Sequence, residues 1–114
     1  MNNWNVHLSN YAESDLHEIY EYIAGKLHEP GIAGNLILRI ESKVSKLNAS
    51  PQSYAIYPKE PWRSRGLRRV NIGKYAIFFI PKEANHSVVV IRIIYGGRDI
   101  DRLLEETPSD SEYE

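Results

Sequence analysis

Apolar residues recur with a helical period in two successive stretches of the chain. Between Asn10 and His28 they fall three or four positions apart, at Ala12, Leu16, Ile19, Tyr20, Ile23 and Leu27. Between Gly31 and Asn48 the same spacing is kept by Ala33, Leu36, Ile37, Ile40, Val44 and Leu47. Pro30-Gly31 separates the two stretches, and Ser50-Pro51 ends the second. The pattern predicts an antiparallel pair of helices, each with one apolar stripe that needs a further surface to cover.

The second half of the chain is rich in β-branched and aromatic residues, which predicts strands. Three candidates are Leu67–Ile72, Tyr75–Ile80 and Val88–Tyr95, and the intervening Gly73-Lys74 predicts a two-residue hairpin turn. A short first strand is expected around Val6 to Leu8. Residues 51–65 contain three prolines and no period, which predicts a long surface loop. The expected fold is α+β, in the order βααβββ, with the helical hairpin packed on one face of a small, mainly antiparallel sheet.

The twofold period of the strands assigns their side chains to faces. Val70 and Ile72 share a face, and Arg69 lies on the opposite one. Strict alternation places Arg92 opposite Ile91. Because burial of an arginine without a partner is costly, the faces that carry Arg69 and Arg92 are expected to be open and turned away from the helices. The alternative for Arg92 is an ion pair with an acidic residue of a helix. Residues expected in the core are Leu16, Ile23, Leu36, Ile40, Ile77, Phe79, Ile91 and Ile93.

Composition limits the classes of protein to which the chain can belong. A length of 114 residues suits one domain, expected to span residues 1–105 and to be followed by an acidic, disordered tail at 106–114. The chain has no cysteine, which excludes disulfides and thiolate sites and favours a cytoplasmic location. Neither a signal peptide nor a membrane span is expected. The scattered histidines lack metal-ligand spacing, so no metal or other cofactor is expected.

The formal net charge of -1 conceals a separation of charge along the chain. Acidic residues dominate both ends, whereas residues 61–82 contain only basic ones. Such a segment suits an anionic partner. The residues predicted to bind that partner are Arg63, Arg65, Arg68 and Arg69. The alternative is that these arginines are simply a solvated loop and strand edge.

Three segments follow one another with an order and spacing that resemble the RelE/ParE toxin superfamily. They are LSNYAESDLHEIYEYIA, GLRRVNIGKYAIFFI and VVVIRIIYGGRDI, and the resemblance spans about Trp4 to Leu104. It implies the βααβββ fold and a growth-inhibiting toxin of a bacterial type II toxin–antitoxin system. It also implies a cognate antitoxin protein as partner, and a working surface on the exposed sheet face and at the end of the last strand.

The superfamily contains two mechanisms. RelE-like members cut mRNA on the ribosome without a metal, and ParE-like members inhibit DNA gyrase. The basic second strand and the strand-end arginine of the RelE-type nuclease are matched here by Arg69, with Arg68 beside it, and by Arg98. Two further positions, an arginine and a tyrosine in that nuclease, hold Ala76 and Leu104. The resemblance therefore favours the ParE-like, plasmid-stabilisation branch and inhibition of a replication enzyme such as DNA gyrase.

Two other functions remain open at this point. The first is a ribosome-dependent mRNA endoribonuclease, and the second is a toxin that has lost toxicity and only binds its antitoxin. Whether the chain inhibits a replication enzyme or cleaves mRNA, the toxicity site is predicted at Arg69, Arg92 and Arg98. These residues are catalytic only if the chain is a nuclease. For Arg98 the simpler alternative is a local turn pair with Asp99.

Overall fold

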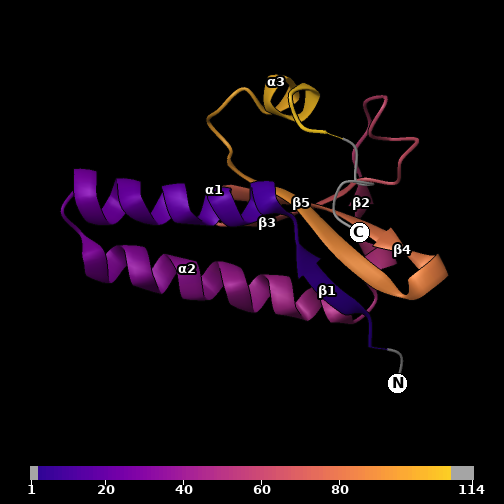
Figure 1. The fold of residues 1–114 in the computed structure, drawn as a ribbon, viewed down its shortest axis with the longest axis horizontal. Coiled ribbons are helices and arrows are strands. Elements are labelled where there is room, and N and C mark those ends of the chain that lie inside the picture. The colour runs from indigo at the N-terminus through magenta and orange to yellow at the C-terminus, as the bar shows by residue number, and fades with distance from the viewer. Residues whose placement is uncertain (1–2, 109–114) are drawn as a thin grey trace.

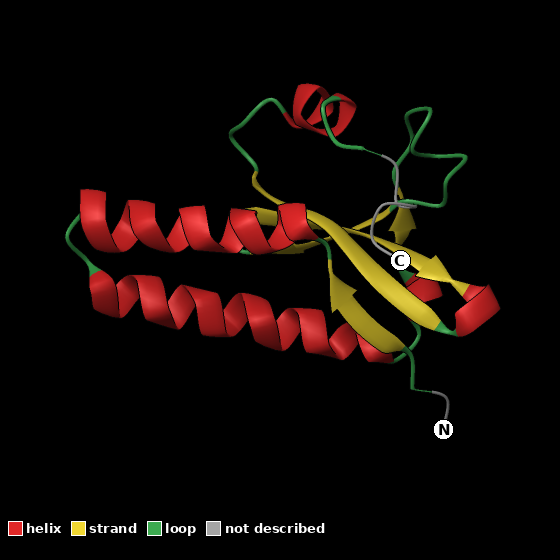
Figure 2. Cartoon of the chain, viewed as in Figure 1, coloured by secondary structure: helices red, strands yellow, loops and turns green. Residues whose placement is uncertain are grey.

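In the computed structural model, which describes residues 3–108, two long helices cover one face of a five-stranded sheet (Figures 1 and 2). The elements are β1 (Asn5–Leu8), α1 (Asn10–Glu21), α2 (Pro30–Ser45), β2 (Ala55–Ile56), β3 (Arg68–Ile72), β4 (Tyr75–Lys82), β5 (Ser87–Tyr95) and α3 (Ile100–Glu105). The sheet order is β1-β5-β4-β3-β2, and only the β1–β5 pair is parallel. The predicted α+β fold is confirmed; β2 and α3 are additions to it.

The start of α1 is tied directly to the sheet. The buried Ser9 hydroxyl accepts a hydrogen bond from the backbone N–H of Ala12 at 3.0 Å and donates one to the carbonyl of Ile91 at 2.8 Å. The serine is therefore both the N-cap of the helix and a contact with β5. At its other end α1 widens into a π-helical turn over Tyr22–Lys26. The predicted first helix is thus continuous up to that turn, and His28, at a φ of 58°, begins the reversal into α2.

The predicted hairpin between β3 and β4 is present. Ile72 pairs with Tyr75, so the turn contains only Gly73 and Lys74. Gly73 has a φ of 57°, which a residue without a Cβ adopts readily.

The predicted side-chain faces are right for β3 and wrong for half of β5. Val70 and Ile72 pack with the core under the helices, as predicted. In β5 the register shifts: Phe78 pairs with Arg92 and Phe79 pairs with Val90, which leaves one extra residue in β5. This bulge resets the alternation. Val88 and Val90 therefore share the helix side with Ile93, whereas Val89 and Ile91 lie on the other side.

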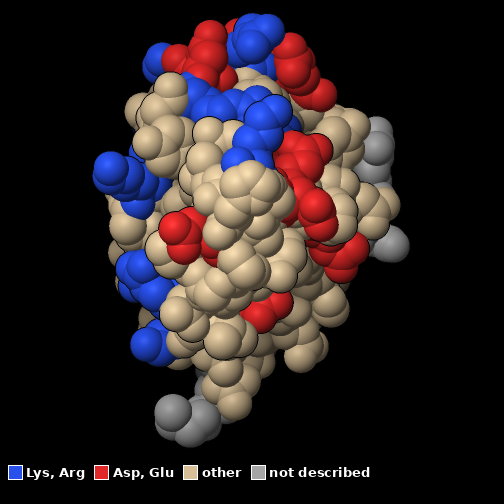
Figure 3. Space-filling view, turned by 90° about the vertical axis from the view of Figure 1, so that its left-hand side faces the viewer, with Lys and Arg blue, Asp and Glu red and all other residues tan. Residues whose placement is uncertain are grey.

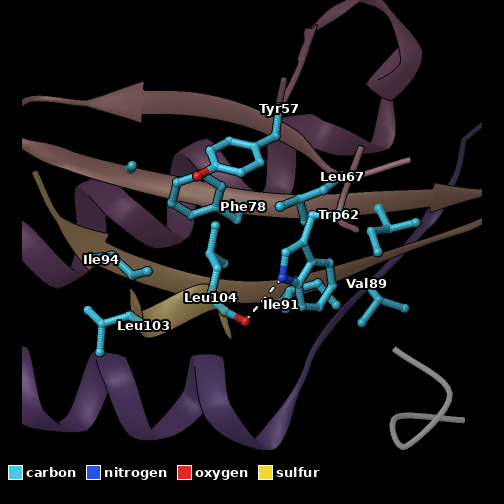
Figure 4. Packing of buried hydrophobic residues seen from close by; sticks show 11 residues of the cluster. Tyr57, Trp62, Leu67, Phe78, Val89, Ile91, Ile94, Leu103 and Leu104 are labelled. Carbon is cyan, nitrogen blue, oxygen red and sulfur yellow. Dashed lines mark hydrogen bonds between the residues drawn. The ribbon is translucent and has the colours of Figure 1, made fainter. Parts of the chain in front are cut away.

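That other side of the sheet is covered, and the prediction of an open face is wrong. A second core forms there beneath α3 and the segment between β2 and β3 (Figure 4). Trp62, 3 % exposed, packs into this core and donates its indole N–H to the carbonyl of Leu104 at 3.1 Å. Tyr57 is also buried, so the predicted surface loop at 51–65 supplies core residues.

The predicted core residues are inside the protein to different degrees. Ile23, Ile40, Ile77, Phe79, Ile91 and Ile93 are buried, and Leu16 and Leu36 are half-buried. Most of the predicted tail, residues 109–114, lies outside the described part of the chain. Of its first residues, Glu106 is the C-cap of α3 and Thr107 is buried. None of the helices among residues 3–108 has the length and apolar character needed to cross a membrane.

Candidate functional site

Arg92 belongs to a buried ion pair and does not reach an open surface. Its Nε and Nη2 donate to the two carboxylate oxygens of Asp15, each at 2.8 Å, and the side chains are 12 % and 10 % exposed. Asp15 also accepts the backbone N–H of Ile93 at 2.8 Å, and Arg92 Nη1 donates to the hydroxyl of Thr107 at 3.0 Å. The predicted position of Arg92 on a cationic surface is wrong, and the alternative pair with a helix carboxylate is the one observed. Any effect of Arg92 on toxicity would act through the elements it joins.

Arg69 and Arg98 line one cavity of about 530 Å³ between β2 and the start of α3. We call it the Arg69–Arg98 cavity. Its lining consists of Ala55, Ile56, Tyr57, Pro58, Lys59, Arg69, Arg98, Asp99, Ile100 and Asp101. The Arg69 guanidinium lies 5.4 Å from the centre of the Phe78 ring, and its Nε donates to the side-chain oxygen of Asn71 at 3.1 Å. Two of the three residues predicted for toxicity are therefore brought together by the fold.

A tight turn sets the position of Arg98. The N–H of Gly96 donates to the carbonyl of Lys74 at 2.7 Å, and the N–H of Arg98 donates to the carbonyl of Tyr95 at 3.0 Å. A Cβ on Gly97 would lie 2.7 Å from the Tyr95 ring, so any larger residue here would displace that ring. Arg98 is exposed, and within residues 3–108 its guanidinium has no hydrogen bond or ion pair. The alternative turn pair of Arg98 with Asp99 is not observed.

Sequence reasoning missed three polar residues of this cavity. The carboxylate of Asp101 accepts hydrogen bonds from the Tyr57 hydroxyl and from the Lys59 ammonium. The hydrogen bonds from Lys59 and Tyr57 hold the pKa of Asp101 below its ordinary value. The hydrogen bond to Asp101 and its negative charge raise the pKa of Lys59. Burial, and then the hydrogen bond to Asp101, raise the pKa of Tyr57 to about 12. No spacing along the chain relates Asp101 to the other two, because the contact joins segments more than 40 residues apart.

The four arginines predicted to bind a partner do not form one surface. Arg63 and Arg65 are exposed on the segment between β2 and β3, and Arg65 stacks 4.7 Å from the centre of the Trp62 ring. Arg68 lies on the helix side of the sheet and donates to the carbonyl of Tyr54 at 2.6 Å. Its Nε is buried without a hydrogen-bond partner among the described residues. In Figure 3 the basic side chains near α3 are interspersed with acidic ones.

The helical hairpin extends past the sheet (Figure 1). A second hollow lies between α1 with its π-helical turn and Tyr75, Ile93 and Tyr95 of the sheet. It has a volume of about 680 Å³, and Arg98 lies at its border with the first cavity. The apolar side chains of Tyr22 and Leu27, 56 % and 50 % exposed, line it. Opposite them, the rings of Tyr75 and Tyr95 meet edge to face with centres 5.4 Å apart.

Two positions that distinguish the RelE-type nuclease lie inside the second core. Ala76 and Leu104 are 0 % and 1 % exposed. Both belong to the core that contains Trp62 and residues of β5, and neither lines the Arg69–Arg98 cavity. Among residues 3–108 no group of histidine, aspartate or glutamate side chains could hold a metal ion.

Comparison with known proteins identifies a family. The family model described as the ParE toxin of the type II toxin–antitoxin system parDE matches residues 6–100. The solved chromosomal ParDE toxin–antitoxin system of P. aeruginosa matches with a TM-score of 0.68 and 21% identity, over 83% of this chain and 98% of that one. The toxin–antitoxin complex RelBE2 of Mycobacterium tuberculosis matches with a TM-score of 0.59 and 19% identity, over 83% and 93%. No curated protein sequence matches at a significant level.

Proposed function

Because the chain belongs to the ParE toxin family of type II toxin–antitoxin systems, we propose that it arrests growth by binding and inhibiting a replication enzyme such as DNA gyrase. A cognate antitoxin neutralises it by binding to the same protein. Both partners are macromolecules of the cytoplasm, where the protein is expected to act. Inhibition by binding needs no cofactor.

The observation that carries this proposal is the burial of Ala76 and Leu104. Metal-free RNA cleavage requires a base, an acid and cations around the scissile phosphate. Arg69 and Arg98 supply cations, but the two positions that would supply a further arginine and a tyrosine are apolar and enclosed. The arrangement therefore favours recognition of a partner over cleavage of RNA.

Tyr57 does not replace the missing catalytic tyrosine. Its hydroxyl donates to Asp101, and its pKa is raised to about 12. A phenol with that pKa is fully protonated at neutral pH, so it does not act as a general base. The Tyr57 hydroxyl donates its proton in a hydrogen bond to the Asp101 carboxylate, so this proton is poorly placed to protonate a leaving group.

The test is induction of the toxin in bacteria, followed by incorporation of labelled thymidine and labelled amino acid. We expect thymidine incorporation to fall first, and purified protein to inhibit DNA supercoiling by gyrase. Arg98→Ala should relieve growth arrest, and Arg98→Lys should relieve it in part, because lysine keeps the charge but loses the bidentate geometry. Arg102→Ala is the matched control, since Arg102 is an exposed arginine of α3 outside the cavity.

Two results would count against this reading, the first against the mechanism and the second against the site. One is an early fall in amino-acid incorporation with cleavage of ribosome-bound mRNA, which would establish the nuclease alternative. The other is a folded Arg98→Ala variant that arrests growth like the wild type, which would remove the Arg69–Arg98 cavity from the toxicity site.

A further inference from the structure

The Arg69–Arg98 cavity already contains one carboxylate, supplied by the protein itself. Asp101 lies in the first turn of α3 and is bound by Tyr57 and Lys59 on the facing segment. The cavity is thus able to hold a carboxylate with donors from a lysine and a tyrosine. Its ion pair is exposed, with Lys59 62 % and Asp101 45 % accessible, so solvent and other solutes reach it.

Two guanidinium groups of the same cavity are left without an acidic partner. Arg69 donates to the side-chain amide oxygen of Asn71, and the Arg98 guanidinium group makes no hydrogen bond or ion pair within the described residues. Guanidinium groups bind carboxylates through paired, charge-assisted hydrogen bonds, which are stronger than bonds between neutral groups. The cavity therefore has donors for a second carboxylate beyond that of Asp101.

We propose that the Arg69–Arg98 cavity binds an acidic side chain of a protein partner, and that Asp101 competes with this side chain for Lys59 and Tyr57. Arg69 and Arg98 hold the incoming carboxylate. Asp101 occupies the neighbouring donors until the partner carboxylate replaces it. The inference rests on the proposed function only in that the partner is a protein.

Charge favours a peptide over a nucleic acid as the occupant. The lining contains three basic side chains and also two acidic ones, Asp99 and Asp101. A chain of phosphates would bring several negative charges against these two aspartates, whereas a single carboxylate brings only one. Apart from Tyr57, the remaining lining is apolar, and Ile56 is 48 % exposed, which suits an apolar neighbour of the acidic residue in a peptide.

Competition at Asp101 does not require α3 to unfold. The other end of the helix is held by the burial of Leu103 and Leu104 and by the hydrogen bond from Trp62. Asp101→Asn should therefore keep α3 in place while it removes the competing charge. Lys59 then becomes available to the incoming carboxylate.

The experiment uses the full chain, labelled with ¹⁵N, and titrates it with N-acetyl-Leu-Glu-Leu-amide while the arginine Nε–H signals are followed by NMR. The matched probe is the peptide with glutamine in place of glutamate. Because an exposed ion pair contributes up to about 1 kcal/mol, we expect the glutamate peptide to bind about fivefold more tightly than the glutamine peptide.

Two variants and a control complete the test. Asp101→Asn should tighten binding of the glutamate peptide by about threefold to fivefold, and Arg98→Ala should weaken it by a similar factor. Arg102→Ala should leave the affinity unchanged. A backbone spectrum of each variant that matches the wild type verifies that the fold is retained.

Three outcomes would overturn the inference: equal affinity for the two peptides, no tightening in Asp101→Asn, or a short single-stranded RNA that saturates the same signals at lower concentration than the glutamate peptide. These outcomes are independent of the labelling experiment above. A protein that fails to bind the peptide but still blocks thymidine incorporation would refute this inference alone.

Discussion

Asp15→Ala tests the buried ion pair that joins α1 to β5. The substitution removes two charge-assisted hydrogen bonds to Arg92 and the acceptor of the Ile93 N–H, all at 2.8 Å in the wild type. It leaves a guanidinium group that is only 12 % exposed without its carboxylate. Loss of one partner of a buried pair typically costs about 3–5 kcal/mol, and we expect a loss of unfolding free energy in this range.

Urea unfolding followed by far-UV circular dichroism measures this loss, with the slope of the transition compared between variants. The double variant Asp15→Leu/Arg92→Met should be less destabilised than Asp15→Ala, because two apolar side chains remove the uncompensated charge. It retains a cost of about 1–3 kcal/mol for the unpaired N–H of Ile93. Arg102 Nη1 lies 3.9 Å from a carboxylate oxygen of Glu106, and both side chains are exposed. Arg102→Ala should therefore change the unfolding free energy by less than about 1 kcal/mol.

The reasoning fails if Asp15→Ala costs less than about 1 kcal/mol with an unchanged slope, since the pair would then behave as a surface salt bridge. It also fails if the loss in Asp15→Leu/Arg92→Met equals the sum of the losses measured in Asp15→Leu alone and in Arg92→Met alone. That result would mean that no coupling free energy connects Asp15 and Arg92.

Three other predictions concern the second face of the sheet. Trp62→Phe should cost about 1 kcal/mol through the lost indole hydrogen bond, and Trp62→Ala about 3–5 kcal/mol through the cavity it leaves, both measured by urea unfolding. In an alkaline titration at 295 nm, one tyrosine should ionise near pH 12, and Tyr57→Phe should abolish that step. Since the folded pKa is raised, this tyrosine stabilises the fold below about pH 10 and the contribution is lost as pH rises toward 12. Arg65→Glu/Arg69→Glu should slow association with the antitoxin and reduce its salt dependence in stopped-flow measurements, and an unchanged salt slope would exclude these residues from the interface.

The helical hairpin was predictable because its determinants are local. Apolar side chains repeat three and four residues apart, and Pro30 stands at the first turn of α2, where its missing N–H costs nothing. The end of α1 was less predictable, since the π-helical turn at Tyr22–Lys26 packs against α2, which a residue period does not report. Residue period alone does not distinguish a π turn from a continuing α-helix.

The cover of the second sheet face was not predictable from a period. It depends on two isolated aromatic residues, Tyr57 and Trp62, and on an α3 of only six residues. Each is a single large side chain or a very short element, whose burial follows from contacts with β4 and β5 far along the chain. The polar residues of the Arg69–Arg98 cavity share this origin, because Asp101 meets Lys59 only after α3 has packed on that face.

The basic residues illustrate why a linear charge pattern does not define a surface. Arg68 and Arg69 are neighbours in β3, yet the pleat sends Arg68 to the helix side and Arg69 to the cavity. Arg92 and Arg98 flank the end of β5, yet one pairs with an acid 77 residues earlier and the other has no acidic partner within the described residues. Charge-assisted pairing with a residue distant in sequence therefore decides which arginine holds the fold together and which remains for a partner.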